Sequence, residues 1–232
     1  QFDLEPQHFS LSRLDLKKGK ICYDNRYAKP EAAGLDVNHL ALSALALRVD
    51  SFFYSPERLT MGISKFSFRE KCGFSLSDMS CRVLMDTARL NIPSLSIVTP
   101  ASRMQAKLAM DLNAFADTLP GSLSANLNAR LGFADMAALL PDMKPYVSRM
   151  PYAFIDVKGE MKGNMQKAHV PVFSLQIPGA MTTRADGWLQ NLTDIDRLKG
   201  HMAFAVRTQQ IDAIRRVLPA ETAASFRLPN NM

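Results

Sequence analysis

Strict alternation of apolar and polar residues is the feature that most constrains the fold of this chain. It is clearest in two runs, 107–113 and 122–131, where an apolar residue stands at every second position. Side chains of a β-strand point alternately to opposite faces, so this period predicts strands with one apolar and one solvated face. The apolar members of the two runs are Leu108, Met110, Leu112, Leu123, Ala125, Leu127, Ala129 and Leu131.

The two runs are separated by Thr118-Leu119-Pro120-Gly121, which has the chemistry of a turn. Proline fixes φ and glycine accepts positive φ, so this tetrapeptide is expected to close a hairpin. Met110 would then lie roughly opposite Leu127, and one apolar face would continue across both strands.

The same period recurs along most of the chain and predicts an antiparallel meander. Lys17-Lys18-Gly19-Lys20 is expected to form a turn. The apolar phase slips by one residue at Ser43-Ala44, which predicts a bulge or bend within a strand. Thr99-Pro100-Ala101-Ser102 is expected to kink a strand midway. Further turns are expected at Gly163-Asn164, Pro178-Gly179, Asp186-Gly187 and Lys199-Gly200.

Two short segments change to helical spacing, and each ends in Leu-Pro. They predict helices near 134–140 and 208–218, stopped by Pro141 and Pro219. The order of long strands, short helix and Leu-Pro therefore occurs twice, which favours a modular structure. We divide the chain into a first β segment, 1–132, and a second, 133–232, as parts of one continuous repeat unit.

Composition favours a folded β protein and argues against nucleic-acid binding. The chain has 232 residues, of which 47% are hydrophobic and only 8% aromatic, and 13 are Met. The net charge is +6, but the basic residues are spread between acidic ones and form no aromatic-interleaved block. The chain begins at Gln1 without a Met, and we interpret it as a segment of a longer protein.

The sequence contains no recognisable catalytic or metal-binding constellation. The four histidines are isolated, and no nucleophile-elbow, metalloprotease, P-loop or dinucleotide motif is present. The three cysteines, Cys22, Cys72 and Cys81, form no CxxC motif. Because their number is odd and their spacing fits no framework, we predict no structural disulfide framework. We therefore expect a non-catalytic protein without a metal or cofactor.

Several short motifs, in order, resemble a known family. They are Phe66-x-Phe68-x-Glu70-Lys71-x-Gly73-Phe74-x-Leu76-x-x-Met79, then Leu95-x-Ile97-x-Thr99-Pro100-x-Ser102, then Phe154-x-x-Val157-x-Gly159-x-x-x-Gly163. From about Leu35 onward the chain resembles AsmA-like proteins, particularly the TamB (translocation and assembly module) proteins of Bacteroidetes. Cys72 replaces the serine that is usual before the glycine in that family.

This resemblance implies a periplasmic protein, anchored in the inner membrane through a segment outside this sequence. It implies an elongated, curved antiparallel β-sheet, like a taco shell, with an apolar concave face and short helices between repeats. Family members are implicated in carrying phospholipid between the inner and outer membranes and in outer-membrane protein assembly. An outer-membrane barrel partner would be met by regions outside this segment.

The residues themselves are compatible with such a groove. A ten-residue strand spans about 33 Å, and burial of an acyl methylene is worth about 0.8 kcal/mol. We expect Leu108, Met110, Leu112, Leu123, Leu127 and Leu131 to line a lipid-conducting face that binds phospholipid acyl chains. The alternative is a closed β-sandwich, a structural or adhesion module of the cell envelope, in which the same residues form a core.

Overall fold

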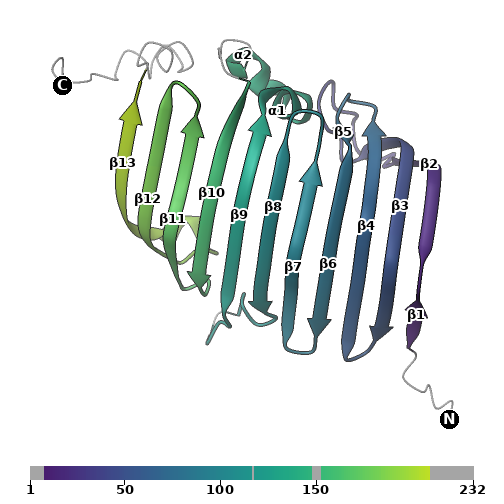
Figure 1. Cartoon of the computed structure of the whole chain (residues 1–232), viewed down its shortest axis with the longest axis horizontal. Helices are drawn as coiled ribbons and strands as arrows, with labels where there is room; N and C mark the ends of the chain where they lie inside the picture. Colours follow the sequence, from purple (N-terminus) through teal and green to yellow (C-terminus); the bar gives the residue numbers. More distant parts are fainter. Residues whose placement is uncertain (1–7, 117, 148–152, 210–232) are drawn as a thin grey trace.

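The computed structural model describes residues 8–116, 118–147 and 153–209, and their strands form one antiparallel sheet of 13 strands (Figure 1). The first part comprises β1 (Phe9–Leu11), β2 (Leu14–Asp24), β3 (His39–Ser55), β4 (Arg58–Glu70), β5 (Ser75–Leu76), β6 (Asp78–Asp86) and β7 (Arg89–Val98). The second comprises β8 (Arg103–Asp111), β9 (Leu123–Gly132), β10 (Phe154–Gly163), β11 (Lys167–Ile177), β12 (Met181–Gln190) and β13 (Lys199–Thr208). The expected mainly β, antiparallel fold is confirmed.

The strand order is almost that of a simple meander. From β6 to β13 each strand pairs with the next one in sequence. At the other edge, β1 and β2 both pair with β3, and the short β5 pairs with β4. The sheet runs without interruption from β9 to β10, through the boundary that we placed at residue 132.

Short helices lie between β9 and β10 at one end of the sheet (Figure 1). They are α1 (Phe133–Leu139), the 3-10 turn η1 (Pro141–Met143) and α2 (Lys144–Val147), with a further 3-10 turn, η2 (Ile195–Arg197), before β13. The predicted helix near 134–140 is confirmed, and it ends before Pro141 as expected. The predicted 208–218 helix lies almost wholly outside the described residues, and Thr208 itself ends β13.

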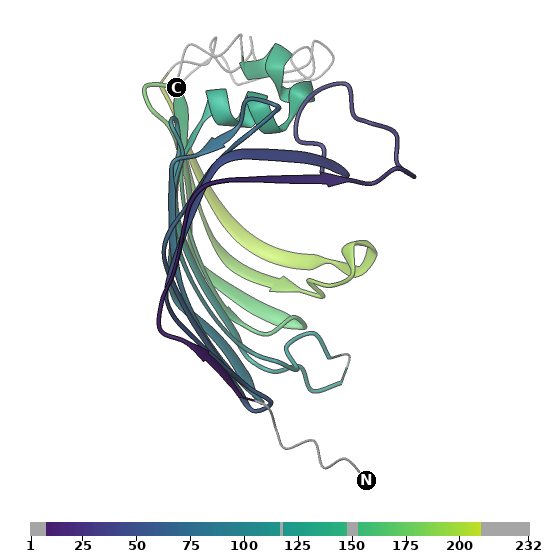
Figure 2. The same ribbon diagram turned by 90° about the vertical axis from the view of Figure 1, so that its right-hand side faces the viewer.

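The sheet is bent into an open trough (Figure 2). One of its two faces carries a hollow lined mainly by apolar side chains. The short helices project from one end on the concave side. Among the described residues no second sheet faces the first one. The closed β-sandwich that we considered as an alternative is therefore not the fold of this part of the chain.

The β8–β9 register differs from our prediction. Met110 pairs with Leu123, and Leu127 pairs with Ala106. The reason is the length of the connection, which runs from 112 to 122 instead of over four residues. The amide of Asp111 donates to the Ser122 carbonyl, so pairing closes directly at the strand ends and Pro120-Gly121 belongs to a longer loop.

Backbone irregularities explain the remaining differences. The predicted bulge at Ser43-Ala44 is confirmed, with Ala44 at φ +50. The predicted turn at Lys17–Lys20 is wrong: Lys18, at φ +59, forms a bulge within β2 instead. The predicted kink at Thr99–Ser102 is wrong as well, because these residues form the β7–β8 hairpin turn.

The four later turn predictions divide evenly. Turns do follow β10 at Gly163-Asn164 and β11 at Pro178-Gly179, where Gly179 has φ +76. By contrast, Asp186-Gly187 lies within β12 and Lys199-Gly200 within β13. Gly187, at φ +154, lies where the β11–β12 register shifts, so the glycine marks a bulge and not a chain reversal.

Candidate apolar binding face

The alternation along each strand combines with the register to give one continuous row of apolar residues across the sheet. Each member pairs with the next one on the neighbouring strand. Eleven strands spaced about 4.8 Å apart make the row about 48 Å long. Its members are Leu14, Val49, Ile63, Cys81, Leu95, Ala106, Leu127, Gly159, Phe173, Ala185 and Phe204.

We call the side of the sheet that carries this row the apolar face, and the opposite side the wet face. The row of residues that are adjacent in sequence to the apolar row, and therefore point to the wet face, illustrates the difference. It runs through Ser80, Ser96, Gln105, Asn128, Lys158, Ser174, Arg184 and Ala205. The period-two pattern thus produces two surfaces of opposite polarity on one layer.

The apolar face is hollowed at its centre. A hollow of about 460 Å³ crosses β7 to β11. Small residues from three neighbouring strands, Ala106, Ala125 and Gly159, leave this space between larger side chains. The larger apolar side chains that line it are Ile92, Leu95, Leu108, Leu127, Val157, Met161, Val170 and Phe173, and Lys107, Asn126 and Glu160 complete the lining.

Gly159 contributes to the hollow by lacking a side chain. A Cβ built at this position would meet only the Phe173 ring, at 3.9 Å, which is an ordinary van der Waals distance. Its backbone does not require positive φ, unlike that of Gly163 at the end of the same strand. The glycine is therefore not required by local backbone geometry, and its effect is to keep the space open.

The structure places the six predicted lining residues in three different settings. Leu108 and Leu127 line the central hollow. Met110 and Leu123 form a pair at the end of β8 and β9, where Leu123 is buried, and Leu131 pairs with Ile155 at the other end of β9. Leu112 lies beyond β8 in the connecting loop and is 43% exposed.

Sequence reasoning missed the small residues and the aromatic residue of the hollow. Gly159 and Phe173 were each visible as members of alternating strands, but their pairing depends on the register of β10 and β11. A bulge within that pair, at Glu160–Lys162, shifts the register in a way that the period-two pattern alone does not fix.

Apolar side chains remain exposed where the apolar face reaches the two edges of the sheet. On β13, Phe204 is 68% and Val206 57% exposed. At the opposite edge, Phe9 is 56% exposed and pairs with Tyr54, which is 48% exposed. Apolar side chains of this face are thus exposed at both edges of the described sheet, whereas Val49, Val170 and Ala185 between the edges are buried.

Ion pairs join neighbouring strands on the wet face. Arg130 on β9 donates two hydrogen bonds to Asp156 on β10, at 2.8 and 3.2 Å, and its pKa is raised by this carboxylate. Arg89 pairs with Asp111 at 3.0 Å. Hydrogen bonds from the Ser122 backbone and hydroxyl lower the pKa of Asp111, and Arg89 adds to this effect.

Two buried carboxylates fasten loops at one end of the sheet. Asp36 is 2% exposed, and its carboxylate contacts the His39 ring at 2.9 Å while accepting backbone N–H groups of Glu31 and Asn38. Glu70, 4% exposed, accepts backbone N–H groups of Ala41 and Cys72. Glu70, the last residue of β4, is thus a buried carboxylate whose two oxygens each accept a backbone hydrogen bond.

These clusters have the chemistry of structural contacts. Burial and the contact of its thiol with Glu70 raise the pKa of Cys72, which disfavours the nucleophilic thiolate. Burial also raises the pKa of Cys81. The described residues contain no group of three or more His, Cys, Asp or Glu side chains that could hold a metal ion.

No family model, curated protein or solved structure matches the chain. No helix among the described residues has both the length and the apolar character needed to cross a membrane.

Proposed function

We propose that this chain is a non-catalytic segment of a cell-envelope protein that carries phospholipid by holding acyl chains along its apolar face. The observation that supports this best is the continuous apolar row of eleven strands, with a central hollow and without a covering layer in the described residues. Water-exposed apolar surfaces of this size mark sites where a protein binds an apolar partner.

The chemistry of the row suits a long aliphatic chain. Each buried methylene contributes about 0.8 kcal/mol, and the contribution does not depend on direction or on a particular partner atom. The row offers neither a charged group nor a strong hydrogen-bonding side chain that would hold an acyl chain at one position. An acyl chain can therefore slide along the row, as movement along the trough requires, and it gains the most contact at the central hollow.

The resemblance to TamB proteins extends this proposal. It adds the periplasm as the location, the inner and outer membranes as the two ends of the path, and a contribution to outer-membrane protein assembly. These elements stay predictions that depend on the short motifs alone.

The test is the lipid content of the purified protein, measured by mass spectrometry of an organic extract. We expect co-purified phospholipid in the parent and at least a fivefold lower lipid-to-protein ratio in Leu127→Asp. Asn128→Asp is the matched control, because it places the same carboxylate at the adjacent position of β9, where the side chain points to the wet face. Its lipid content should equal that of the parent.

A second variant separates lost binding from lost folding. Gly159→Leu fills the hollow with an apolar side chain and adds no charge, so the fold should survive while bound lipid decreases. Cooperative thermal melting near the parent value verifies the fold of each variant. A parent without bound lipid, or a folded Gly159→Leu variant with unchanged lipid, would contradict the proposal.

A further inference from the structure

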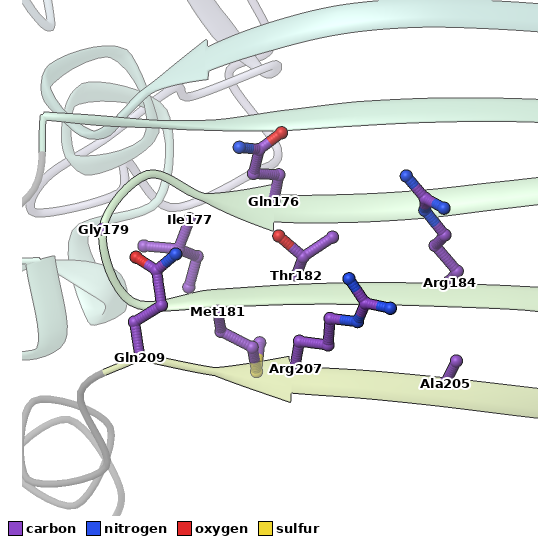
Figure 3. Close-up of a pocket in the computed structure, with 9 residues that line it drawn as sticks. All are labelled: Gln176, Ile177, Gly179, Met181, Thr182, Arg184, Ala205, Arg207 and Gln209. Carbon is purple, nitrogen blue, oxygen red and sulfur yellow. The ribbon is translucent and has the colours of Figure 1, made fainter.

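The wet face carries a separate hollow near the end of β11, β12 and β13, as Figure 3 shows. Its volume is about 280 Å³, far more than the roughly 10–15 Å³ needed to hold one water. Polar donors, two of them arginines, line it together with the apolar side chains of Ile177 and Met181. Its lining residues are Gln176, Ile177, Gly179, Met181, Thr182, Arg184, Ala205, Arg207 and Gln209. We call it the arginine basin.

The strand register brings the two arginines together. Arg184 on β12 pairs with Ala205 on β13, and Thr182 pairs with Arg207, so the two guanidinium-bearing residues are diagonal neighbours. Diagonal positions on one face are about 7–8 Å apart, within reach of long side chains. Figure 3 shows both arginines on the same side of the strands as Gln176 and Thr182.

The basin contains two positive charges and no carboxylate among its nine lining residues. Neither arginine forms an ion pair within the described part of the chain, whereas Arg130 on the same face pairs with Asp156 at 2.8 Å. The nearest carboxylate along β12, Asp186, lies two residues beyond Arg184 and does not line the basin. Two neighbouring like charges repel, and a bound anion would remove this repulsion.

We propose that the arginine basin binds a phosphate monoester. Guanidinium groups bind phosphate through paired, parallel N–H donors, and two of them match the two charges of a monoester dianion. The Gln176 and Gln209 amides and the Thr182 hydroxyl supply further donors for the ester substituent. The volume exceeds that of a bare phosphate, so a small polar substituent such as glycerol fits as well.

This site is independent of acyl-chain binding, because it lies on the opposite face of the sheet. The phosphate could belong to a soluble metabolite or to a lipid headgroup in a membrane placed against the wet face. Both sources present the same chemistry to the arginines, and the experiment distinguishes them.

The test uses isothermal titration calorimetry of the whole chain with glycerol 3-phosphate at constant ionic strength. We expect saturable binding that weakens at least tenfold in Arg184→Gln and in Arg207→Gln. Arg103→Gln is the matched control, since Arg103 is an exposed wet-face arginine that pairs with no acidic side chain in the described residues and lies outside the basin. Its affinity should stay within twofold of the parent value.

Affinity should also rise as pH increases through about 6, where a phosphate monoester gains its second charge. Vesicles of phosphatidylcholine with and without phosphatidic acid then identify the source. Retention on phosphatidic acid vesicles that is lost in Arg184→Gln assigns a headgroup, and binding of the soluble ester alone assigns a metabolite. Absence of binding to both probes, or equal weakening by Arg103→Gln, would overturn the proposal.

Discussion

At the scale of single residues, the Asp135 side chain holds the Thr99–Ser102 turn against α1. The hydroxyls of Thr99 and Ser102 both donate to the Asp135 carboxylate in the first helical turn of α1. The Ser102 hydroxyl oxygen in turn accepts the amide of Gly132, at 3.0 Å. This network joins the β7–β8 hairpin to the end of β9 and fixes the position from which α1 begins.

Asp135→Ala should therefore destabilise the fold by about 1–3 kcal/mol, because two hydroxyl donors lose their charged partner in a partly buried site. Urea denaturation followed by circular dichroism measures the change. Asp142→Ala is a matched control in the same helical region, since Asp142 is exposed. Its effect should stay below about 0.5 kcal/mol; equal effects of the two variants would exclude the proposed role of Asp135.

Asp36 should make the stability of the fold depend on pH in the acid range. The backbone N–H of Glu31 above all, then that of Asn38 and the His39 ring, hold the pKa of Asp36 below its usual range. A lowered folded-state pKa stabilises the native state above the unfolded pKa of about 3.9, and this contribution is lost as pH falls through the folded value. Hydrogen bonds from Cys72 and Ala41 likewise outweigh burial and lower the pKa of Glu70.

We therefore expect the melting temperature of the parent to fall steeply below about pH 4. Asp36→Asn should melt at a lower temperature near neutral pH and show a shallower fall in acid, as measured by circular dichroism. Parallel curves for parent and variant would show that Asp36 does not contribute to the acid dependence.

At the scale of secondary-structure elements, the period-two pattern predicted that strands form, but it did not predict all of their pairings and turns. It correctly predicted an antiparallel sheet and the bulge at Ser43-Ala44, and the change to helical spacing correctly predicted the short helix before Pro141. Within strands, parity also assigned Leu108 and Leu127 to the same face. These features depend on neighbours in sequence, which a pattern records directly.

Register and turn positions depended on information that the pattern does not contain. Glycine in this chain marks both turns, as at Gly179, and bulges, as at Gly187, and the two have the same local composition. Because the loop after Asp111 is longer than predicted, Met110 pairs with Leu123 and not with the predicted Leu127. The arginine basin escaped sequence reasoning for the same reason, because its residues meet only through the β12–β13 register.

The bulge in β3 offers a direct test of the strand backbone. Ala44 has φ +50, a region in which an L-residue costs roughly 1 kcal/mol and glycine almost nothing. Ala44→Gly should therefore leave the free energy of unfolding unchanged or raise it by up to about 1 kcal/mol. Ala46→Gly, two residues along the same strand, should lower it by about 0.5–1 kcal/mol; the opposite order in chemical denaturation would contradict this backbone conformation.

At the scale of the whole molecule, the described residues form one curved layer of sheet and not two packed sheets. A sheet with one apolar face normally buries it against another element. Here no second sheet of the described residues covers that face, and Phe9 at one edge and Phe204 at the other are exposed. We infer that an apolar ligand takes the place of that element, and that acyl chains lie on the apolar face.

Site-specific photo-crosslinking tests this claim most directly. A photoreactive amino acid is placed at Leu127 on the apolar face or at Asn128 on the wet face, in the cells that produce the protein. The two positions are adjacent in sequence and differ in the face to which they point. After irradiation, mass spectrometry should find phospholipid crosslinked at Leu127 and at least tenfold less at Asn128. Equal crosslinking at both positions, or none at Leu127, would contradict the claim that the apolar face carries lipid.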